Sequence, residues 1–294
     1  MSSIRTVLSV VGDAETGRSP IVTGLLVGKL LNCHIEGFHV QIDAVSTVPY
    51  VGEAMAGALI EEMVETAERD VSNRAIAARQ LFMDICSERK MLMNCTPAEN
   101  AGFCATWNEA RGPEPEQVAL RGRVADLIVL SARGAGGAAA SLLTLNAALL
   151  ESGRAVLLAP TEAPTSIGRH VAIAWNASAE AARAVGDAMP FLTRAEKVTV
   201  IIASDGDTGE TGIARVDELQ QNLAWHGVSF DTVILEQPGS RSKMAQVLID
   251  SCVECGADLL VMGAYTHSRL RQLILGGVTR TVLETAPLPV LLSH

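Results

Sequence analysis

The chain has 294 residues with 23 basic and 33 acidic side chains, so its net charge is −10 and its pI is near 5.1. This length is typical of two domains, and 48% hydrophobic against 19% charged residues excludes a disordered chain. The acidic balance argues against nucleic-acid binding, and no apolar run reaches the roughly 18 residues that cross a membrane. The first residues resemble neither a signal nor a transit peptide, and six cysteines without framework spacing predict reduced thiols. We therefore expect a cytoplasmic protein.

The chain contains an internal repeat. Three segments recur in its two halves: 5–11 as 169–175, 125–130 as 257–262, and 156–160 as 290–294. A repeat of this length is far too long for a solenoid and predicts a duplicated domain. We expect one copy at 1–160 and the other at 166–294, joined by the polar linker 161–165, which contains Pro164.

Strands and helices are expected to alternate along both copies. In the first copy the expected strands lie near 5–11, 37–40, 103–108, 125–130 and 156–160, and 49–90 is mostly helix-forming. In the second copy strands are expected at 169–175, 197–203, 228–235, 258–262 and 289–292, with helices beginning near Ser178 and over 213–226, 240–255 and much of 269–285. Buried apolar strands that alternate with helices predict an α/β fold with a parallel sheet covered on both faces.

The segment after the fourth strand of the second copy has the composition of an anion site. Gly263 stands at the strand end, where a glycine permits a sharp turn, and Gly276 and Gly277 interrupt a helical pattern and expose backbone N–H groups. Thr279 adds a hydroxyl beside a basic stretch. In open parallel sheets ligands bind beyond the carboxyl ends of the strands, so this loop is expected to hold a phosphate.

This segment resembles the nucleotide loop of the universal stress proteins, whose pattern is G-x2-G-x9-G-(S/T). Gly263, the nine-residue spacing, Gly276, Val278 and Thr279 match, whereas Thr266 replaces the second glycine and Gly277 replaces the Ser or Thr. The resemblance extends over both halves and implies two tandem universal-stress-type domains. Each would be a five-stranded parallel sheet of order 3-2-1-4-5, and the two would pack as an intramolecular pseudo-dimer through their last strands.

The same resemblance implies a stress-response regulatory protein that binds an adenine nucleotide, ATP with or without Mg²⁺, in its C-terminal copy. The implied nucleotide-binding residues are Asn176, Ala203, Gly263, Thr266, His267, Arg269, Gly276, Gly277, Val278 and Thr279. Asn176 stands where ATP-binding members place an Asp, and it keeps hydrogen-bonding capacity without the charge. Thr266 can either donate a hydrogen bond to the ligand or narrow the pocket. The expected partners are the nucleotide and an unidentified regulatory protein, and a further homodimer is left open.

The first copy departs further from the pattern. Ser131 and Thr144 replace its first and third glycines, Gly134 alone matches, and Gly12 stands where the second copy has Asn176. We therefore expect a degenerate loop in the first copy that holds no phosphate-bearing nucleotide in the family's manner.

The sequence leaves two other functions open, an interaction protein that has lost nucleotide binding and an enzyme on a related nucleotide-binding fold. No P-loop, G-x-G-x-x-G, G-x-S-x-G or H-E-x-x-H motif occurs, so we expect no catalytic residues, no metal site and at most slow ATP hydrolysis. Cys252 and Cys255 form a C-x-x-C at a helix end, where two packed thiols are the expected state. Trp175 is expected either to pack in the core or to stack on a base, and Arg280 to join a surface ion pair.

Overall fold

The computed structural model describes residues 4–42, 57–97, 102–132, 142–204, 215–236, 241–264 and 277–294. Its strands are β1 (Thr6–Val10), β2 (His34–Gln41), β3 (Cys104–Arg111), β4 (Leu127–Ser131), β5 (Ala155–Ala159), β6 (His170–Trp175), β7 (Lys197–Ser204), β8 (Asp231–Glu236), β9 (Leu259–Gly263) and β10 (Val290–Ser293). Its helices are α1 (Arg18–Leu31), α3 (Gly57–Glu88), α4 (Glu114–Gly122), α5 (Leu142–Glu151), α6 (Ala179–Leu192), α8 (Val216–Trp225), α9 (Arg241–Glu254) and α10 (Gly277–Thr285). Helices and strands alternate, as the sequence pattern predicts.

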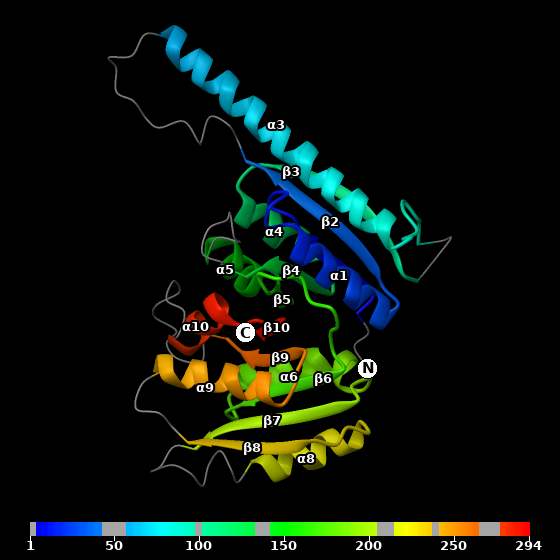
Figure 1. The fold of residues 1–294 in the computed structure, drawn as a ribbon, viewed down its shortest axis with the longest axis vertical. Coiled ribbons are helices and arrows are strands. Elements are labelled where there is room, and N and C mark those ends of the chain that lie inside the picture. The colour runs from blue at the N-terminus through cyan, green and yellow to red at the C-terminus, as the bar shows by residue number, and fades with distance from the viewer. Residues whose placement is uncertain are drawn as a thin grey trace.

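All of these strands join one ten-stranded sheet of order β3-β2-β1-β4-β5-β10-β9-β6-β7-β8 (Figure 1). The first half follows the order 3-2-1-4-5, and the second half repeats that order in reverse, which confirms the expected fold of each copy. Pairing within each half is parallel. The two halves meet at an antiparallel pair in which Leu157 of β5 faces Leu291 of β10, so the last strands join the two sheets as the resemblance implies.

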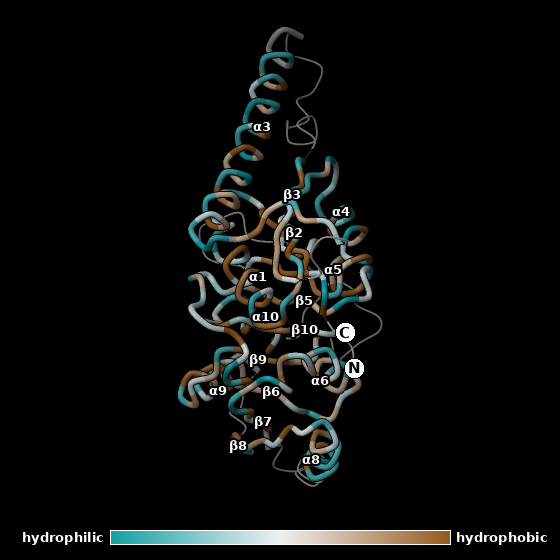
Figure 2. The backbone as a smooth tube through the Cα atoms, turned by 90° about the vertical axis from the view of Figure 1, so that its right-hand side faces the viewer, coloured by the Kyte–Doolittle hydropathy of each residue, from teal (hydrophilic) through white to brown (hydrophobic). Residues whose placement is uncertain are grey.

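Both faces of the sheet are buried because successive strand side chains point to opposite faces. Val7, Val129 and Leu157 contribute to one core, which α1, α3, α6 and α8 cover. Leu8 and Ile128 contribute to the other core, which α4, α5, α9 and α10 cover. Each core runs through both halves of the molecule, and in Figure 2 hydrophobic stretches lie on helices as well as on strands. Two-sided burial explains why the strands read as continuous apolar runs.

A repeated aspartate ties the beginnings of neighbouring strands together. The Asp126 carboxylate accepts hydrogen bonds from the backbone N–H groups of Arg5 and Thr6, at 2.8 and 3.0 Å, and one from the Thr6 hydroxyl. In the second half, Asp258 accepts one at 3.0 Å from the backbone N–H of His170. Both aspartates belong to the repeated segments 125–130 and 257–262. Part of the internal repeat therefore holds neighbouring strands in alignment.

Helix α3 is the feature in which the first half departs most from the second. The expected helix-forming stretch at 49–90 contains this single helix of 32 residues, and residues 43–56 lie outside the described part of the chain. Ala75, Ala78, Phe82 and Ile85 are buried at intervals of three or four residues, which packs the C-terminal half of the helix on the sheet. No residue from 61 to 74 is buried, and that half of α3 extends past the sheet (Figure 1). Within the described ranges, no helix combines the length and the hydropathy that a membrane crossing requires.

Candidate functional site

The parallel strands β6, β7 and β9 end at the same edge of the sheet and bring the first predicted residues together. Trp175 of β6 is level with Ile202 of β7, and Ala174 is level with Met262 of β9. Asn176, Ala203 and Gly263 each come one residue after these partners. The structure therefore gathers these three expected site residues at the carboxyl edge of the second half-sheet.

Asn176 is exposed and lies in the turn that starts helix α6. Its side-chain oxygen accepts a hydrogen bond from the backbone N–H of Ser178 at 3.1 Å, and Ala177 between them has a φ of +57°. The Ser178 hydroxyl oxygen in turn accepts from the backbone N–H of Ala181 at 3.1 Å, which confirms Ser178 as the helix cap. The side-chain oxygen of Asn176 therefore stabilises the turn, and the exposed side chain lies at the surface.

Gly263 is explained by packing against this same turn of α6. A Cβ atom built on Gly263 would lie 2.6 Å from the backbone nitrogen of Ala181 and 2.7 Å from the carbonyl carbon of Glu180. Both atoms belong to the backbone and cannot rotate away. The expected sharp turn is not what requires a glycine, because Gly263 is the last residue of β9 and has no positive φ. The close approach of α6 is the physical reason for this glycine.

The beginning of α10 supplies the remaining described residues of the expected loop. Gly277 is the first residue of the helix and is exposed, while Val278 packs against the second core and Thr279 is 7% exposed. The N–H groups of a first helical turn have no partner within the helix and carry a partial positive charge. Thr266, His267, Arg269 and Gly276 lie outside the described residues.

The corresponding edge of the first half is occupied by its own side chains. Thr144 near the start of α5 is buried, and its hydroxyl donates a 2.8 Å hydrogen bond to the Glu114 carboxylate. The Asp13 carboxylate after β1 accepts from the backbone N–H groups of Glu15 and Thr16 at 3.0 and 2.8 Å. An anion near the start of α5 would meet the Glu114 carboxylate, which is consistent with the expected degenerate loop.

Other singled-out side chains have structural roles here. Trp175 packs against the first core, and its indole nitrogen is buried without a hydrogen-bond partner among the described residues. Arg280 pairs with Glu284 at 3.1 Å, as expected, and both line a small cavity of about 10 Å³ between the two halves. Cys252 and Cys255 are free thiols, and burial raises the pKa of Cys252 to about 12.

The prediction that all six cysteines are reduced thiols is wrong for one pair. Cys95 and Cys104 form a disulfide, with their Cα atoms 6.5 Å apart. The backbone around residue 93 pairs with β3 and carries Cys95 alongside the start of that strand. His34 at the start of β2 lies beside the same sulfur atoms. One signal for part of this cluster was present in the sequence. His34 and Cys104 begin neighbouring parallel strands, and the first residues of such strands lie at the same edge of the sheet.

Comparison with known proteins agrees with this architecture. Residues 168–294 match the model of the Universal stress protein family. The second half of the chain is a universal stress protein domain. Among solved structures, a universal stress protein from Archaeoglobus fulgidus has 18% identity and a TM-score of 0.62 over 99% of this chain and 96% of that one. A putative universal stress protein from Pseudomonas aeruginosa has 17% identity and a TM-score of 0.59 over 99% of this chain and 93% of that one.

These likenesses show that the fold of both halves together, and not only that of the matched domain, is shared with universal stress proteins. No curated protein matches the sequence significantly.

Proposed function

We propose that this protein is a stress-response regulatory protein whose universal stress domain at 168–294 binds ATP, with or without Mg²⁺, and changes its protein partners on binding. The observation that carries the proposal is the difference between the two carboxyl edges. In the second half an exposed Gly277 begins α10, and an exposed Asn176 stands at the same edge. In the first half the corresponding region holds Thr144 bonded to Glu114.

The proposed mechanism uses backbone groups more than side chains. The N–H groups of the first turn of α10 would hold phosphate oxygens, since helix N-termini favour anions through unpaired donors and the helix dipole. Asn176 and Ala203 would border the base or ribose at the ends of β6 and β7. Thr266, His267, Arg269 and Gly276 complete the proposed site by the family pattern alone.

A second candidate, an interaction protein that does not bind nucleotide, is favoured by one observation. Gly263 is accounted for by its contact with α6, the partly buried Val278 by its packing on the second core, and Thr279 by burial, so none of the three requires a ligand. The two candidates differ in a single measurable property, which is nucleotide affinity.

Calorimetric titration of the whole chain with ATP and Mg²⁺ tests the proposal. We expect saturable binding near one ATP per chain, because among the described residues the start of α10 carries an exposed Gly277, whereas Thr144 near the start of α5 is bonded to the Glu114 carboxylate. Absence of heat up to millimolar ATP would reject nucleotide binding and favour the interaction protein.

A matched pair of variants locates the site. Gly277→Asp places a carboxylate near the proposed phosphates, whereas Leu143→Asp places one near the start of α5, where Leu143 is 60% exposed. An acidic residue in a first helical turn does not weaken the helix. At about 6 Å and an effective dielectric of about 20 to 80, repulsion of about 0.7 to 2.8 kcal/mol weakens ATP binding about 3- to 100-fold. Leu143→Asp should leave the affinity unchanged, and equal effects of the two variants would reject the assignment to the second half.

A further inference from the structure

The amino edge of the first half-sheet carries a cluster of metal-binding side chains, on strands that β1, β4, β5 and β10 separate from β9 and the proposed nucleotide edge. His34 begins β2 and is level with Cys104, which begins β3. Cys95 lies beside both, and the three possible ligand atoms all lie within 4.8 Å of one another. Cys104 is buried, whereas His34 and Cys95 are partly exposed, so the cluster is open to small solutes.

The backbone holds Cys95 in this place independently of the disulfide. The N–H of Ala105 donates to the carbonyl of Leu92, and the N–H of Asn94 donates to the carbonyl of Ala105, both at 2.9 Å. Residues 92–94 thus pair with β3 along its free edge. Because these bonds do not involve sulfur, Cys95 and Cys104 remain neighbours when the disulfide is reduced.

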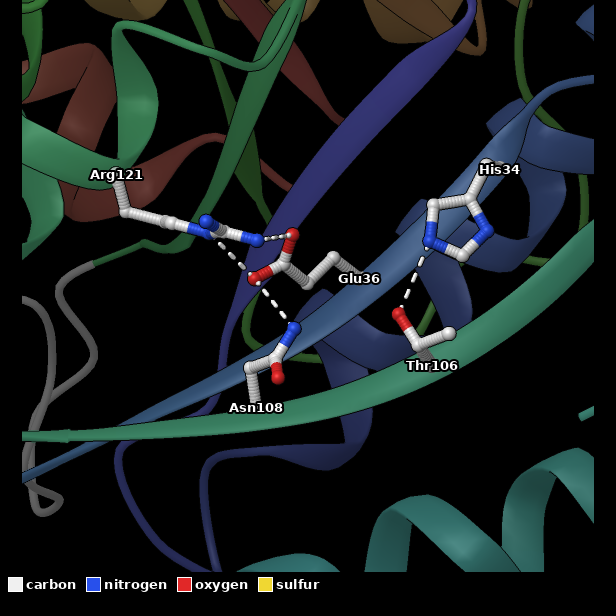
Figure 3. A network of polar contacts seen from close by, with 5 residues as sticks. All are labelled: His34, Glu36, Thr106, Asn108 and Arg121. Atoms are coloured by element: carbon white, nitrogen blue, oxygen red, sulfur yellow. Dashed lines mark hydrogen bonds and ion pairs between the residues drawn. The ribbon is translucent and has the colours of Figure 1, made fainter. Parts of the chain in front are cut away.

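The imidazole of His34 is oriented as a metal-ligating histidine would be. Its Nε2 lies 3.0 Å from the Thr106 hydroxyl oxygen (Figure 3). Its Nδ1 lies 3.2 Å from the Cys104 sulfur. In the tautomer with the proton on Nε2, that nitrogen donates to Thr106 and the lone pair of Nδ1 points to Cys104. Histidine ligands of metals characteristically have their second ring nitrogen bonded to an oxygen in this way.

Glu36, the nearest carboxylate along β2, is already occupied. Arg121 donates two hydrogen bonds to its oxygens at 2.7 and 2.8 Å, and Asn108 donates a third at 3.0 Å (Figure 3). The available ligands are therefore two sulfur atoms and one imidazole nitrogen. Three protein ligands of this kind with a fourth position for water form a tetrahedral set that suits Zn²⁺.

We propose that Cys95, Cys104 and His34 form a binding site for Zn²⁺ or a similar thiophilic divalent ion when the disulfide is reduced. Reduction by a phosphine or dithiol adds two electrons and two protons to the S–S bond, and the metal then displaces both thiol protons. With Zn–S near 2.3 Å and Zn–N near 2.0 Å, tetrahedral geometry needs sulfur atoms about 3.8 Å apart and about 3.6 Å from Nδ1. Rotation of the two cysteine side chains provides that opening, and the disulfide is the metal-free, oxidised form.

The experiment titrates the whole chain with Co²⁺, which reports thiolate ligation by its charge-transfer absorption. The chain is reduced with a phosphine, freed of reductant without air, titrated with Co²⁺ and then with Zn²⁺. We expect a saturable band at one Co²⁺ per chain that Zn²⁺ abolishes, and no band in the oxidised chain. A reduced chain without this band would overturn the proposal and leave the disulfide a purely structural link.

Four variants assign the ligands. Cys95→Ser and His34→Gln should lower Co²⁺ affinity at least tenfold, while Cys255→Ser, which changes the partly exposed thiol of the C-x-x-C, should have no effect. Thr106→Val removes only the partner of Nε2, so it should lower the affinity about 10- to 100-fold with the band retained at saturation. Circular dichroism establishes that each variant is folded. Loss of the band in Cys255→Ser with an unchanged Cys95→Ser would reject the site, and neither result depends on nucleotide binding.

Discussion

Replacing Gly263 by alanine tests whether packing or ligand access explains this glycine. The added Cβ would lie 2.6 Å from the Ala181 nitrogen and 2.7 Å from the Glu180 carbonyl carbon, so the start of α6 must move away from β9. Overpacking of this kind costs about 1 to 3 kcal/mol. For a protein of this size that corresponds to a melting temperature lower by about 2 to 12 °C.

Gly186→Ala is the matched control, since it makes the same change within α6 itself. Nothing lies within 4 Å of the Cβ that would be added there, and alanine is a better helix former than glycine by about 0.5 to 1 kcal/mol. The two variants should therefore change stability in opposite directions. Thermal and urea unfolding followed by circular dichroism, without nucleotide, measures both. A Gly263→Ala protein as stable as the parent would refute the packing explanation.

Three further predictions concern the aspartates at the strand beginnings, the cap of α6 and the titration of His170. Asp126→Ala should lower the free energy of unfolding by about 1 to 3 kcal/mol, and by more than Asp258→Ala, because Asp126 accepts hydrogen bonds from two backbone N–H groups and one hydroxyl and Asp258 accepts one from a backbone N–H; urea unfolding of both variants compares them. Ser178→Ala should cost about 1 kcal/mol by loss of the α6 cap, and an unchanged urea midpoint would contradict that role. Burial, and then Lys197, lower the pKa of His170 below 6.5, so the unfolded chain binds more protons and stability should fall as the pH drops through about 6.5. His170→Gln should flatten this dependence in urea midpoints compared at about pH 7.5 and about pH 5.5, and an unchanged slope would contradict it.

Local sequence patterns were sufficient to predict the helices and strands and their order along the chain. The apolar runs at 169–175 and 257–262 are buried on both faces of the sheet and became β6 and β9. Ser178 caps α6 because a serine before a helical stretch can accept from a free N–H of the first turn, which is a contact between near neighbours in sequence. The strand order within each half came from the resemblance to the universal stress proteins, and the structure confirms it.

Contacts between distant segments were decided only by the tertiary structure. The reason for Gly263 is a helix that begins more than 80 residues earlier, and no spacing rule within the loop could reveal it. The Cys95–Cys104 disulfide and its neighbour His34 meet because an extended segment pairs with the edge of β3, and the C-x8-C spacing alone carries no such register.

The sequence by itself determined the duplication, the α/β class and most strands, because these depend on hydrophobic periodicity and on local caps. The tertiary structure decided which glycines are required by packing, which residues of the expected loop are buried, and which cysteines meet. The physical reason is that burial and side-chain contact depend on the positions of several elements at once, whereas periodicity depends on the neighbours of each residue along the chain. Thr279 shows the difference, because its sequence context indicates a phosphate ligand and the fold places it 7% exposed.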